Sequence, residues 1–258
     1  MGGHRGRTRS EQAGGPLQAL APRAPPGKTV SAVWERLSPP ALRVMQLADG
    51  EAERLGHLYL GDEHVLLGLL GHGDPDTAAV LNDYGIGLAA GRAEMDRLVE
   101  SGVVPGPRPD DATLLRDLGV DLDVVRAEME ATFGGVAVAQ ATRRVMRRPR
   151  WKGGRRRTPL CGRLLLVKRA LGLAAAFATE HGQPRIGPGQ LLLGVLADAA
   201  DPIDAGLSRR GRFELGRVGL CPGAPAPTRL IFRARGIDLA ALRTSTEAAV
   251  RAGRRRER

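Results

Sequence analysis

The sequence predicts an all-α fold, and three observations support this prediction. Apolar residues recur at intervals of three and four positions, which places them on one face of a helix. Ser, Asp, Pro and Gly, which favour helix ends, separate these apolar segments. No segment alternates β-branched and polar residues, as a half-buried strand would. Aromatic residues make up only 3% of the 258 residues, so we expect an aliphatic core of Leu, Val and Ala.

The first two helices are predicted from their caps and apolar positions. Ser38 is a good N-cap, and the two prolines that follow it are tolerated in a first helical turn. Gly56 is expected to end this helix. Asp62 is expected to cap a second helix, which is apolar almost all round over 63–70 and is therefore predicted to be buried. The predicted apolar face of the first helix consists of Leu42, Met45, Leu47, Ala48, Ala52 and Leu55.

Two further helices complete the unit. Asp74 and Pro75 open a third helix, in which residues 78–81 are expected to face the core and which Gly85 ends. A fourth helix is predicted from Leu88 to about Glu100.

The chain also contains an internal repeat, with an offset of 126 residues that relates Gly56 to Gly182. The first helix matches without gaps, with Leu47, Ala48 and Ala52 against Leu173, Ala174 and Ala178. The second helix repeats as well, with the matching positions Gly56, Gly61, Leu66, Leu67, Gly68, Leu70 and Gly182, Gly187, Leu192, Leu193, Gly194, Leu196.

A second signature occurs three times, at 85–88, 119–122 and 236–239. Each copy reads Gly, an aliphatic residue, Gly or Asp, and Leu, and an Arg follows four residues later: Arg92, Arg126 and Arg243. A glycine that ends one helix and a short residue that caps the next explain this pattern. We therefore expect two tandem four-helix units with a partial copy, 110–134, inserted between them.

The predicted organisation has five parts. Residues 1–36 form a basic arm rich in Gly, Pro and Arg that is expected to be disordered. The first repeat spans 37–102, and 103–157 hold the partial repeat and an Arg-rich linker. A degenerate second repeat spans 158–252, with an interruption at 203–227 that is expected to loop out at least in part. A basic tail, 253–258, closes the chain.

The net charge of +11 is concentrated in one segment. Without this segment of nine basic residues and no acid, the remaining charge is only +2. Two interpretations stay open: a solvated linker extended by self-repulsion, or a surface that neutralises phosphates of nucleic acid. The segment consists of Arg143, Arg144, Arg147, Arg148, Arg150, Lys152, Arg155, Arg156 and Arg157.

Several classes of protein are excluded by composition. No apolar run approaches the ~18 residues of a membrane span, and no apolar segment of a secretory signal precedes residue 36, so we expect a cytoplasmic protein without a membrane partner. Cys161 and Cys221 are too few for a disulfide scaffold or a four-cysteine zinc site and are interpreted as inert thiols. The G-x-x-x-x-G-K-[ST] pattern is absent and no nucleophile–base pair stands out, so neither a cofactor nor catalysis is expected.

The segment LGHLYLGDEHVLLGLL at 55–70 resembles the LGHxYIGTEHLLLGLL core of the Clp amino-terminal domain, the Clp-N or Clp R repeat of the ClpA, ClpC and ClpB chaperones. Residues 41–45 resemble the RAxxVL first helix of that family, and 119–122 and 236–239 resemble its LGVD turn. The resemblance implies a pseudo-twofold bundle of two four-helix repeats. The inserted copy resembles actinobacterial stand-alone proteins that carry two such units without ATPase modules.

The resemblance also implies a binding role. In the ClpC branch the domain docks adaptors and substrates, and some members bind phosphorylated arginine through the Glu of the GTEH turn, which maps to Glu63. A carboxylate suits a guanidinium group, and the start of a helix suits a phosphate. Asp62 replaces the usual Thr, so Asp62, Glu63 and His64 form the predicted partner-binding set. In the second unit Gly189 and Gln190 replace Glu and His, and that site is expected to be lost.

Other interpretations of this turn are simpler. Glu63 is equally explained as a first-turn carboxylate that interacts favourably with the helix dipole. His57, His64, Asp62 and Glu63 are expected to diverge rather than to bind a metal, and His64 is interpreted as a partly buried packing or hydrogen-bonding residue. The sequence therefore predicts a non-catalytic interaction module for adaptors, substrates or Clp subunits. The alternatives are a nucleic-acid-associated protein that uses 143–157, and a degenerating paralogue.

Overall fold

The computed structural model describes residues 30–107, 116–146 and 166–256. Within these ranges the regular elements are helices, accompanied by two isolated β-bridges, and the predicted all-α fold is confirmed. No helix of the described residues is long and apolar enough to cross a membrane. The chain divides into two compact units, one formed by 1–106 and 162–258 and the other by 107–161.

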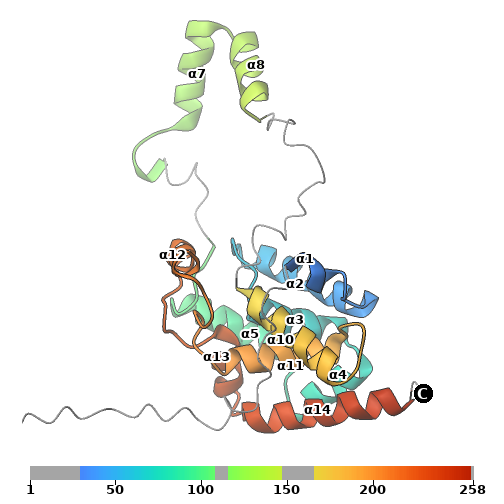
Figure 1. Ribbon diagram of the computed structural model, residues 1–258. Coiled ribbons are helices and arrows are strands. Elements are labelled where there is room, and N and C mark those ends of the chain that lie inside the picture. The colour runs from blue at the N-terminus through green and yellow to red at the C-terminus, as the bar shows by residue number, and fades with distance from the viewer. Residues whose placement is uncertain (1–29, 108–115, 147–165, 257–258) are drawn as a thin grey trace, which may run out of the picture. The chain divides into compact units, whose positions relative to one another are not determined.

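The larger unit holds the helices of both repeats (Figure 1). Its N-terminal half consists of α1 (Val30–Trp34), α2 (Pro39–Arg54), α3 (Asp62–His72), α4 (Pro75–Asp83) and α5 (Leu88–Glu100). Its C-terminal half consists of α10 (Val167–Glu180), α11 (Pro188–Ala199), α12 (Arg209–Arg217), α13 (Pro227–Ala234) and α14 (Leu239–Arg256).

The predicted helix ends agree with the structure in all but one place. The Ser38 hydroxyl accepts a hydrogen bond from the Ala41 amide at 3.3 Å, and the Asp74 carboxylate accepts one from the Thr77 amide at 3.1 Å. The N-cap of α3 is Gly61 rather than Asp62, which is the first residue of the helix. Asp62 was the wrong choice because a side chain further along α3, and not the cap residue itself, satisfies the free amide at this end.

The buried face of α2 is rotated slightly from the predicted one. Leu42 was expected in the core but is 39% exposed, whereas Val44 is fully buried. Ala48, which the predicted face included, lies at the close approach to α3, where a Cβ atom added to Gly68 would lie 3.2 Å from Ala48 Cβ.

The 126-residue offset is reproduced in the packing of the two halves. A Cβ atom added to Gly68 of α3 would lie 2.5 Å from the carbonyl oxygen of Val44. A Cβ atom added to Gly194 of α11 would lie 2.3 Å from the carbonyl oxygen of Ala170. Both pairs differ by the same 126 positions, so α3 crosses α2 and α11 crosses α10 at one common register.

The two repeats are interlocked by a pseudo-twofold arrangement. In the centre α3 packs against α11, while α4 packs against α14 and α13 packs against α5 (Figure 1). The turns that lead to α5 and α14 are equivalent, because Gly85 and Gly236 have φ values of 69° and 67°. The aliphatic residues after them, Ile86 and Ile237, donate backbone hydrogen bonds to Leu81 and Phe232 respectively. The two four-helix repeats therefore belong to one compact unit.

The ends of the larger unit are more ordered than the sequence suggested. Residues 1–36 were expected to be disordered, but α1 begins at Val30, and Val33 and Leu37 are buried. Backbone hydrogen bonds join Ile186 to Arg36 and Ser38, at 2.8 and 2.9 Å, and tie this segment to the second repeat. The expected tail, 253–258, is likewise helical as far as Arg256. Residues 1–29 and 257–258 lie outside the described residues.

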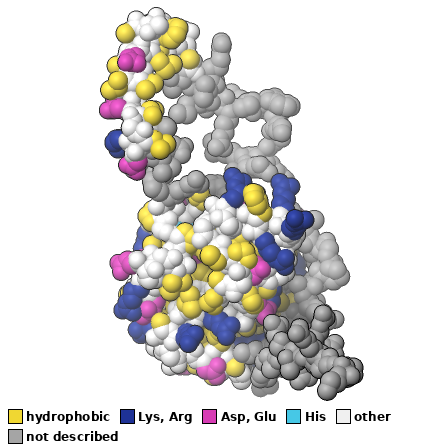
Figure 2. Space-filling view, turned by 90° about the vertical axis from the view of Figure 1, so that its left-hand side faces the viewer, with side chains coloured by type: hydrophobic (Ala, Val, Ile, Leu, Met, Phe, Trp, Pro, Cys, Tyr) yellow, Lys and Arg dark blue, Asp and Glu magenta, His cyan; other side chains and the backbone are white. Residues whose placement is uncertain are grey.

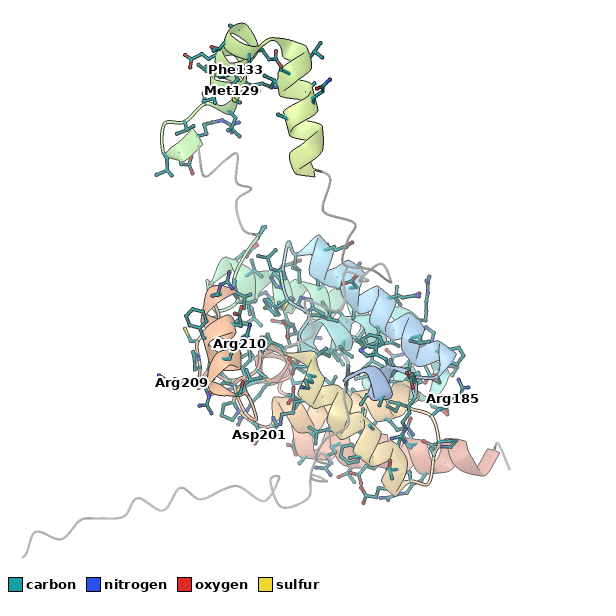
Figure 3. All side chains as sticks on the ribbon, turned by 45° about the horizontal axis from the view of Figure 1, so that its top comes forward. Met129, Phe133, Arg185, Asp201, Arg209 and Arg210 are labelled. Atoms are coloured by element: carbon teal, nitrogen blue, oxygen red, sulfur yellow. The ribbon has the colours of Figure 1, made fainter. Side chains whose placement is uncertain are left out.

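The smaller unit is a helical hairpin of α7 (Leu122–Phe133) and α8 (Gly135–Met146), which pack against each other. Asp121 of the 119–122 signature is the N-cap of α7, and Gly134, with a φ of 82°, separates α7 from α8. Of the described side chains in 116–141 only Val138 is buried. Hydrophobic side chains cover much of the hairpin surface in Figure 2, among them Met129 and Phe133, which Figure 3 labels.

The close approach of the paired helices makes a stability prediction. Gly68→Ala and Gly194→Ala are each expected to lower the free energy of unfolding by about 1–3 kcal/mol, because the new methyl group meets a backbone carbonyl that cannot move aside. Gly50→Ala in α2 is the matched control, since nothing lies within 4 Å of its added Cβ atom. This control should gain about 0.5–1 kcal/mol. Urea unfolding of the three variants measures these differences, and equal stability at all three positions would contradict the proposed packing.

Candidate functional site

Each repeat presents a turn between its first two helices, and the two turns share one backbone design. The first turn spans 56–63 and the second 182–189. Each begins with a glycine in the left-handed region, since Gly56 and Gly182 have φ values of 67° and 64°. Each buries an aliphatic residue, Leu60 or Ile186, immediately before the next helix.

A side chain three residues into the helix caps each turn from within. The Gly61 amide donates to His64 Nδ1 at 3.0 Å, and the Gly187 amide donates to Gln190 Oε1 at 2.9 Å. A free amide at the start of each helix is therefore satisfied by the same position of the repeat.

A second side chain holds the capping residue in place. His57 Nδ1 lies 2.9 Å from His64 Nε2, and in the second repeat Gln183 accepts a hydrogen bond from the Gln190 amide. His64 Nδ1 accepts a hydrogen bond from the Gly61 amide, so the ring proton of His64 sits on Nε2. This Nε2–H group donates a hydrogen bond to His57 Nδ1. His64 is therefore neutral, and the His–His pair has the same structural role as the Gln–Gln pair.

The first turn also gathers groups that are capable of binding a metal. Ligand atoms of His57, Glu63 and His64 all lie within 4.8 Å of one another, so the expectation that these side chains diverge was wrong. The turn of the chain between Gly56 and Gly61 folds His57 back over the start of α3. Both nitrogens of His64 are already used in hydrogen bonds, and glutamine replaces both histidines in the second repeat. These two facts favour a structural role for the imidazoles.

The three residues predicted to meet a partner are all buried. The exposed fractions are 4% for Asp62, 1% for Glu63 and 0% for His64. Neither oxygen of Glu63 accepts a hydrogen bond of normal geometry from a described residue. Burial raises the pKa of the Glu63 carboxyl well above its usual value, and the nearby Asp62 carboxylate raises this pKa further. These three side chains are therefore covered in this conformation, and their role as the partner-binding set stays a prediction.

Two segments of the second repeat cover the first turn. Tyr59, the turn residue that lies beside Glu63, packs in a hydrophobic cluster with Leu215 and Leu220, which belong to α12 and the chain that follows it. Thr228 of α13 lies beside Asp62 from another side. The cluster is completed by Leu166, Ile203, Leu207 and Val218. The sequence did not reveal this cover, because it comes mainly from residues 200–226, which are far along the chain from the first turn.

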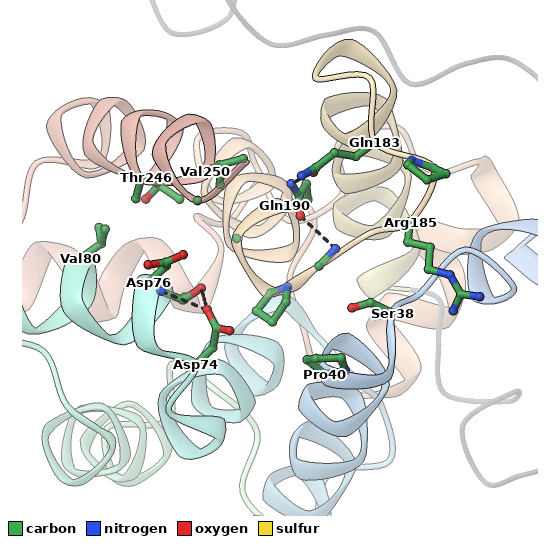
Figure 4. A pocket seen from close by; sticks show the side chains of 17 residues that line it. Ser38, Pro40, Asp74, Asp76, Val80, Gln183, Arg185, Gln190, Thr246 and Val250 are labelled. Atoms are coloured by element: carbon green, nitrogen blue, oxygen red, sulfur yellow. Dashed lines mark hydrogen bonds between the residues drawn. The ribbon is translucent and has the colours of Figure 1, made fainter. Parts of the chain in front are cut away.

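The second turn, in contrast, opens into a cavity of about 460 Å³ (Figure 4). Its walls come from both repeats: the start of α2, the first half of α4, the turn itself and the middle of α14. Figure 4 shows Asp74 and Asp76 on the α4 side, Thr246 and Val250 on the α14 side, and Arg185 nearer to α2. The lining residues are Ser38, Pro40, Asp74, Asp76, Thr77, Val80, Gln183, Pro184, Arg185, Gly187, Pro188, Gly189, Gln190, Thr246, Ala249, Val250 and Gly253.

Glycine at position 189 contributes to this open space. Gly189 occupies the position of Glu63 in the repeat, and a Cβ atom added to it would lie 2.6 Å from Val250 Cγ2. A side chain at 189 would therefore press against α14. The turn was expected to have lost its site together with its carboxylate, yet Asp74 and Asp76 of the facing repeat bring two carboxylates to the same cavity. Asp74 was expected from the sequence only as a helix cap, because its place beside the second turn depends on how the repeats interlock.

The signature arginines form structural ion pairs. Arg92 Nε donates to Glu51 Oε1 at 3.0 Å, and Arg54 Nε donates to Glu51 Oε2 at 2.9 Å. Burial raises the pKa of the Glu51 carboxyl, but the hydrogen bonds from Arg92 and Arg54 outweigh it and lower the pKa below 4.5. In the second repeat Arg243 pairs with Glu247 at 3.0 Å and lies over the ring of Phe177. These arginines join helices and do not face the cavity.

The remaining candidates lie mostly outside the described residues. Arg143 and Arg144 belong to α8, and the rest of the basic segment, 147–157, is not described. Cys161 also lies outside the described residues, whereas Cys221 is a free and exposed thiol.

Comparison with known proteins identifies relatives of the first repeat. The model of the Clp repeat (R) N-terminal domain matches residues 17–84 and 36–114 in two overlapping alignments. The ClpA homologue of the ATP-dependent Clp protease ATP-binding subunit from Brassica napus chloroplasts is 40% identical over 101 residues, which are 38% of this chain and 11% of that protein. Chaperone protein ClpC1 from Arabidopsis thaliana chloroplasts is 43% identical over 74 residues, 29% of this chain and 8% of that protein. The chain thus corresponds to about a tenth of the length of these relatives.

Among solved structures, the chain is similar to the N-terminal domain of the chaperone ClpD from Arabidopsis thaliana. The superposition covers 86% of this chain and 99% of that domain, with 14% sequence identity and a TM-score of 0.44.

The buried Glu63 predicts that its replacement stabilises the protein at neutral pH. The folded state binds the Glu63 proton more tightly than the unfolded state does. The contribution of Glu63 to the stability of the protein therefore decreases as the pH rises above the usual pKa of 4.5. Glu63→Gln removes the titration. The difference in melting temperature between Glu63→Gln and the unchanged protein should therefore shift in favour of Glu63→Gln between pH 4 and pH 8. A difference that does not change with pH would show that Glu63 is not buried as described.

Glu51 predicts the opposite sign. Its lowered pKa means that its stabilising contribution is complete above pH 4.5 and is lost as the pH falls through the folded-state pKa. Glu51→Gln should therefore lower the free energy of unfolding by about 1–2 kcal/mol at pH 7 and by less below pH 4. Thermal unfolding across this pH range measures both variants side by side. A Glu51→Gln variant as stable as the unchanged protein at pH 7 would refute the ion-pair assignment.

Proposed function

We propose that the chain is a non-catalytic protein-interaction module of the Clp system, because residues 17–84 and 36–114 match the model of the Clp repeat (R) N-terminal domain. The named relatives are chaperones and ATP-binding subunits of the Clp protease, and they match this chain only in their N-terminal-domain sequence. The partners that we propose are adaptors, substrates or Clp subunits.

The observation that carries the proposal is the cavity at the second turn. It is large enough for one or two side chains of a partner segment, and both repeats contribute to it. Val80 and Val250 supply apolar surface, while Asp74 and Asp76 supply carboxylates that favour a cationic or hydrogen-bond-donating group. An apolar wall with a few polar groups is the usual composition of a recognition site.

The phosphoarginine hypothesis at the first turn carries a structural condition. Glu63 is almost completely buried, so a guanidinium group reaches it only after the cover formed by Tyr59 and the α12 segment has moved. We retain binding at Asp62, Glu63 and His64 as a proposal for that opened state. The second turn needs no such movement and is the primary docking site in our proposal.

A second candidate function uses the basic segment at 143–157. Nine positive charges without an acid favour contact with phosphates, and such binding weakens steeply as the salt concentration rises. Docking in the cavity depends on shape and on buried groups and is therefore expected to resist salt.

The proposal is tested by filling the cavity. Ala249→Trp places an indole in it, whereas Ala248→Trp, one residue earlier on α14, points to solvent because Ala248 is exposed. Both proteins are immobilised, and Clp subunits and adaptors bound from lysate are quantified by mass spectrometry at moderate and high salt. Ala249→Trp should reduce their capture at least about tenfold, the loss expected when an anchor worth about 1.4 kcal/mol is blocked.

The control variant and the salt series separate the two functions. Ala248→Trp should bind as the unchanged chain does. If both variants capture Clp proteins equally, the cavity is not the docking site. If only nucleic acid and its associated proteins are retained, and high salt releases them unless 143–157 is neutralised, the basic segment is the functional element.

A further inference from the structure

We propose that residues 200–226 are an intramolecular plug. The plug covers a site at the first turn that is equivalent to the open cavity at the second turn. The closure stands on the geometry described below, whereas the identity of what the opened site binds rests on the proposed function. The plug gives the module one open site and one gated site.

The plug is an insertion that only one repeat contains. In the first repeat α3 is joined to α4 by Gly73 and Asp74 alone, whereas in the second repeat residues 200–226 join α11 to α13. The two ends of this segment are clamped together by an antiparallel bridge between Pro202 and Pro225 and by a 2.9 Å hydrogen bond from Ile203 to Ala224. A loop whose ends meet in this way is removable without changing the path of the helices that it connects.

The segment between the clamped ends is ordered by its own contacts. Ser208 caps α12 by accepting the Gly211 amide at 3.2 Å, and Arg212 pairs with Asp204 at 3.1 Å. Leu215 is fully buried although α12 is otherwise mostly exposed, and Arg209 and Arg210 in its first turn are exposed. The helix is therefore built to present one apolar edge to the body of the unit.

That apolar edge lies on the first turn. Leu215 and Leu220 pack against Tyr59, which is 4% exposed. The equivalent residue of the second turn is Arg185, which is exposed and lines the open cavity. One position of the repeat is thus sealed by the plug in the first turn and faces solvent in the second, although the hydrogen bonds that shape both turns are the same.

Opposing forces act on the closed plug. Burial of Leu215, Leu220 and Tyr59 favours closure. Burial of the two neighbouring carboxyl groups of Asp62 and Glu63 opposes it, because each resists being charged beside the other in an apolar environment. An opened plug removes the cover over Tyr59 and the Glu63 carboxyl beside it, whereas Thr228 of α13 stays beside Asp62. A partner that offers a cationic side chain to Glu63 therefore favours the open state, and the gated site has a cationic segment as its ligand class.

Carboxyl footprinting tests the closure without any partner. The intact chain is treated with a carbodiimide and a small amine, and modification at each Asp and Glu is quantified by mass spectrometry. Glu63 should be protected, while Asp74 and Asp76 at the open cavity should react. Leu215→Asp should raise the labelling of Glu63 several-fold. Phe213→Asp on the same helix is the matched control, because Phe213 is 68% exposed, and Glu63 should stay protected in it.

A second variant keeps the test decisive if Leu215→Asp unfolds. Replacement of residues 200–226 by Gly-Asp, the link of the first repeat, should leave a folded protein in which Glu63 is labelled while Glu51 stays protected by its ion pairs. Protection of Glu63 in this folded variant, or labelling of Glu63 in the intact chain to the level of Asp76, would overturn the plug. Labelling of Glu51 in both variants would mean that both are unfolded. This result would also overturn the plug, because residues 200–226 would then be a necessary part of the core.

These outcomes are independent of the proposed function. Loss of Clp capture in Ala249→Trp concerns the second turn alone. An oligo-arginine peptide provides the binding readout for the plug, since it should bind the loop-replaced variant more tightly than the intact chain, and Glu63→Gln in that variant should remove the gain. Equal binding with and without the plug would overturn the ligand class, whether or not Clp proteins are captured.

Discussion

The close crossing of paired helices at glycine is the constraint on which the rest of the structure depends. Gly68 and Gly194 bring the backbone of α3 onto α2 and that of α11 onto α10, at one register in both repeats. With these pairs fixed, α3 and α11 meet in the centre. The last two helices of the first repeat, α4 and α5, then pack against α14 and α13 of the second repeat. The turn that precedes α3 or α11 therefore lies beside helices of the opposite repeat, so both repeats contribute to the surroundings of each turn.

The two turns have diverged on this shared frame. The capping pair His57–His64 has become Gln183–Gln190 without loss of the hydrogen bonds that hold the helix start. Glu63, in contrast, has become Gly189, and the carboxylates near the second turn come from α4 instead. The two repeats therefore share the backbone frame of the turn, whereas the carboxyl groups are buried at the first turn and line an open cavity at the second.

Much of the fold was predictable from sequence, because helix ends and repeat offsets are local signals. Ser38, Asp74 and Gly85 mark helix ends where expected, and the 126-residue offset reappears as equivalent packing at Gly68 and Gly194. The state of the candidate site was not predictable in this way. The burial of Glu63 depends on residues 200–226, and the cavity beside Gly189 depends on Asp74 and Asp76, so both follow from contacts between segments that are far apart in the chain.

The central claim is that two equivalent turns differ in access, one open and one covered. NMR relaxation by a soluble paramagnetic probe measures this directly in the intact chain. We predict stronger relaxation of the amides of Gly187 and Gly189, which are partly exposed residues, than of the amides of Gly61 and Glu63, which are buried residues. Equal relaxation at the two turns would contradict the account, because the open site and the gated site would then be the same in solution.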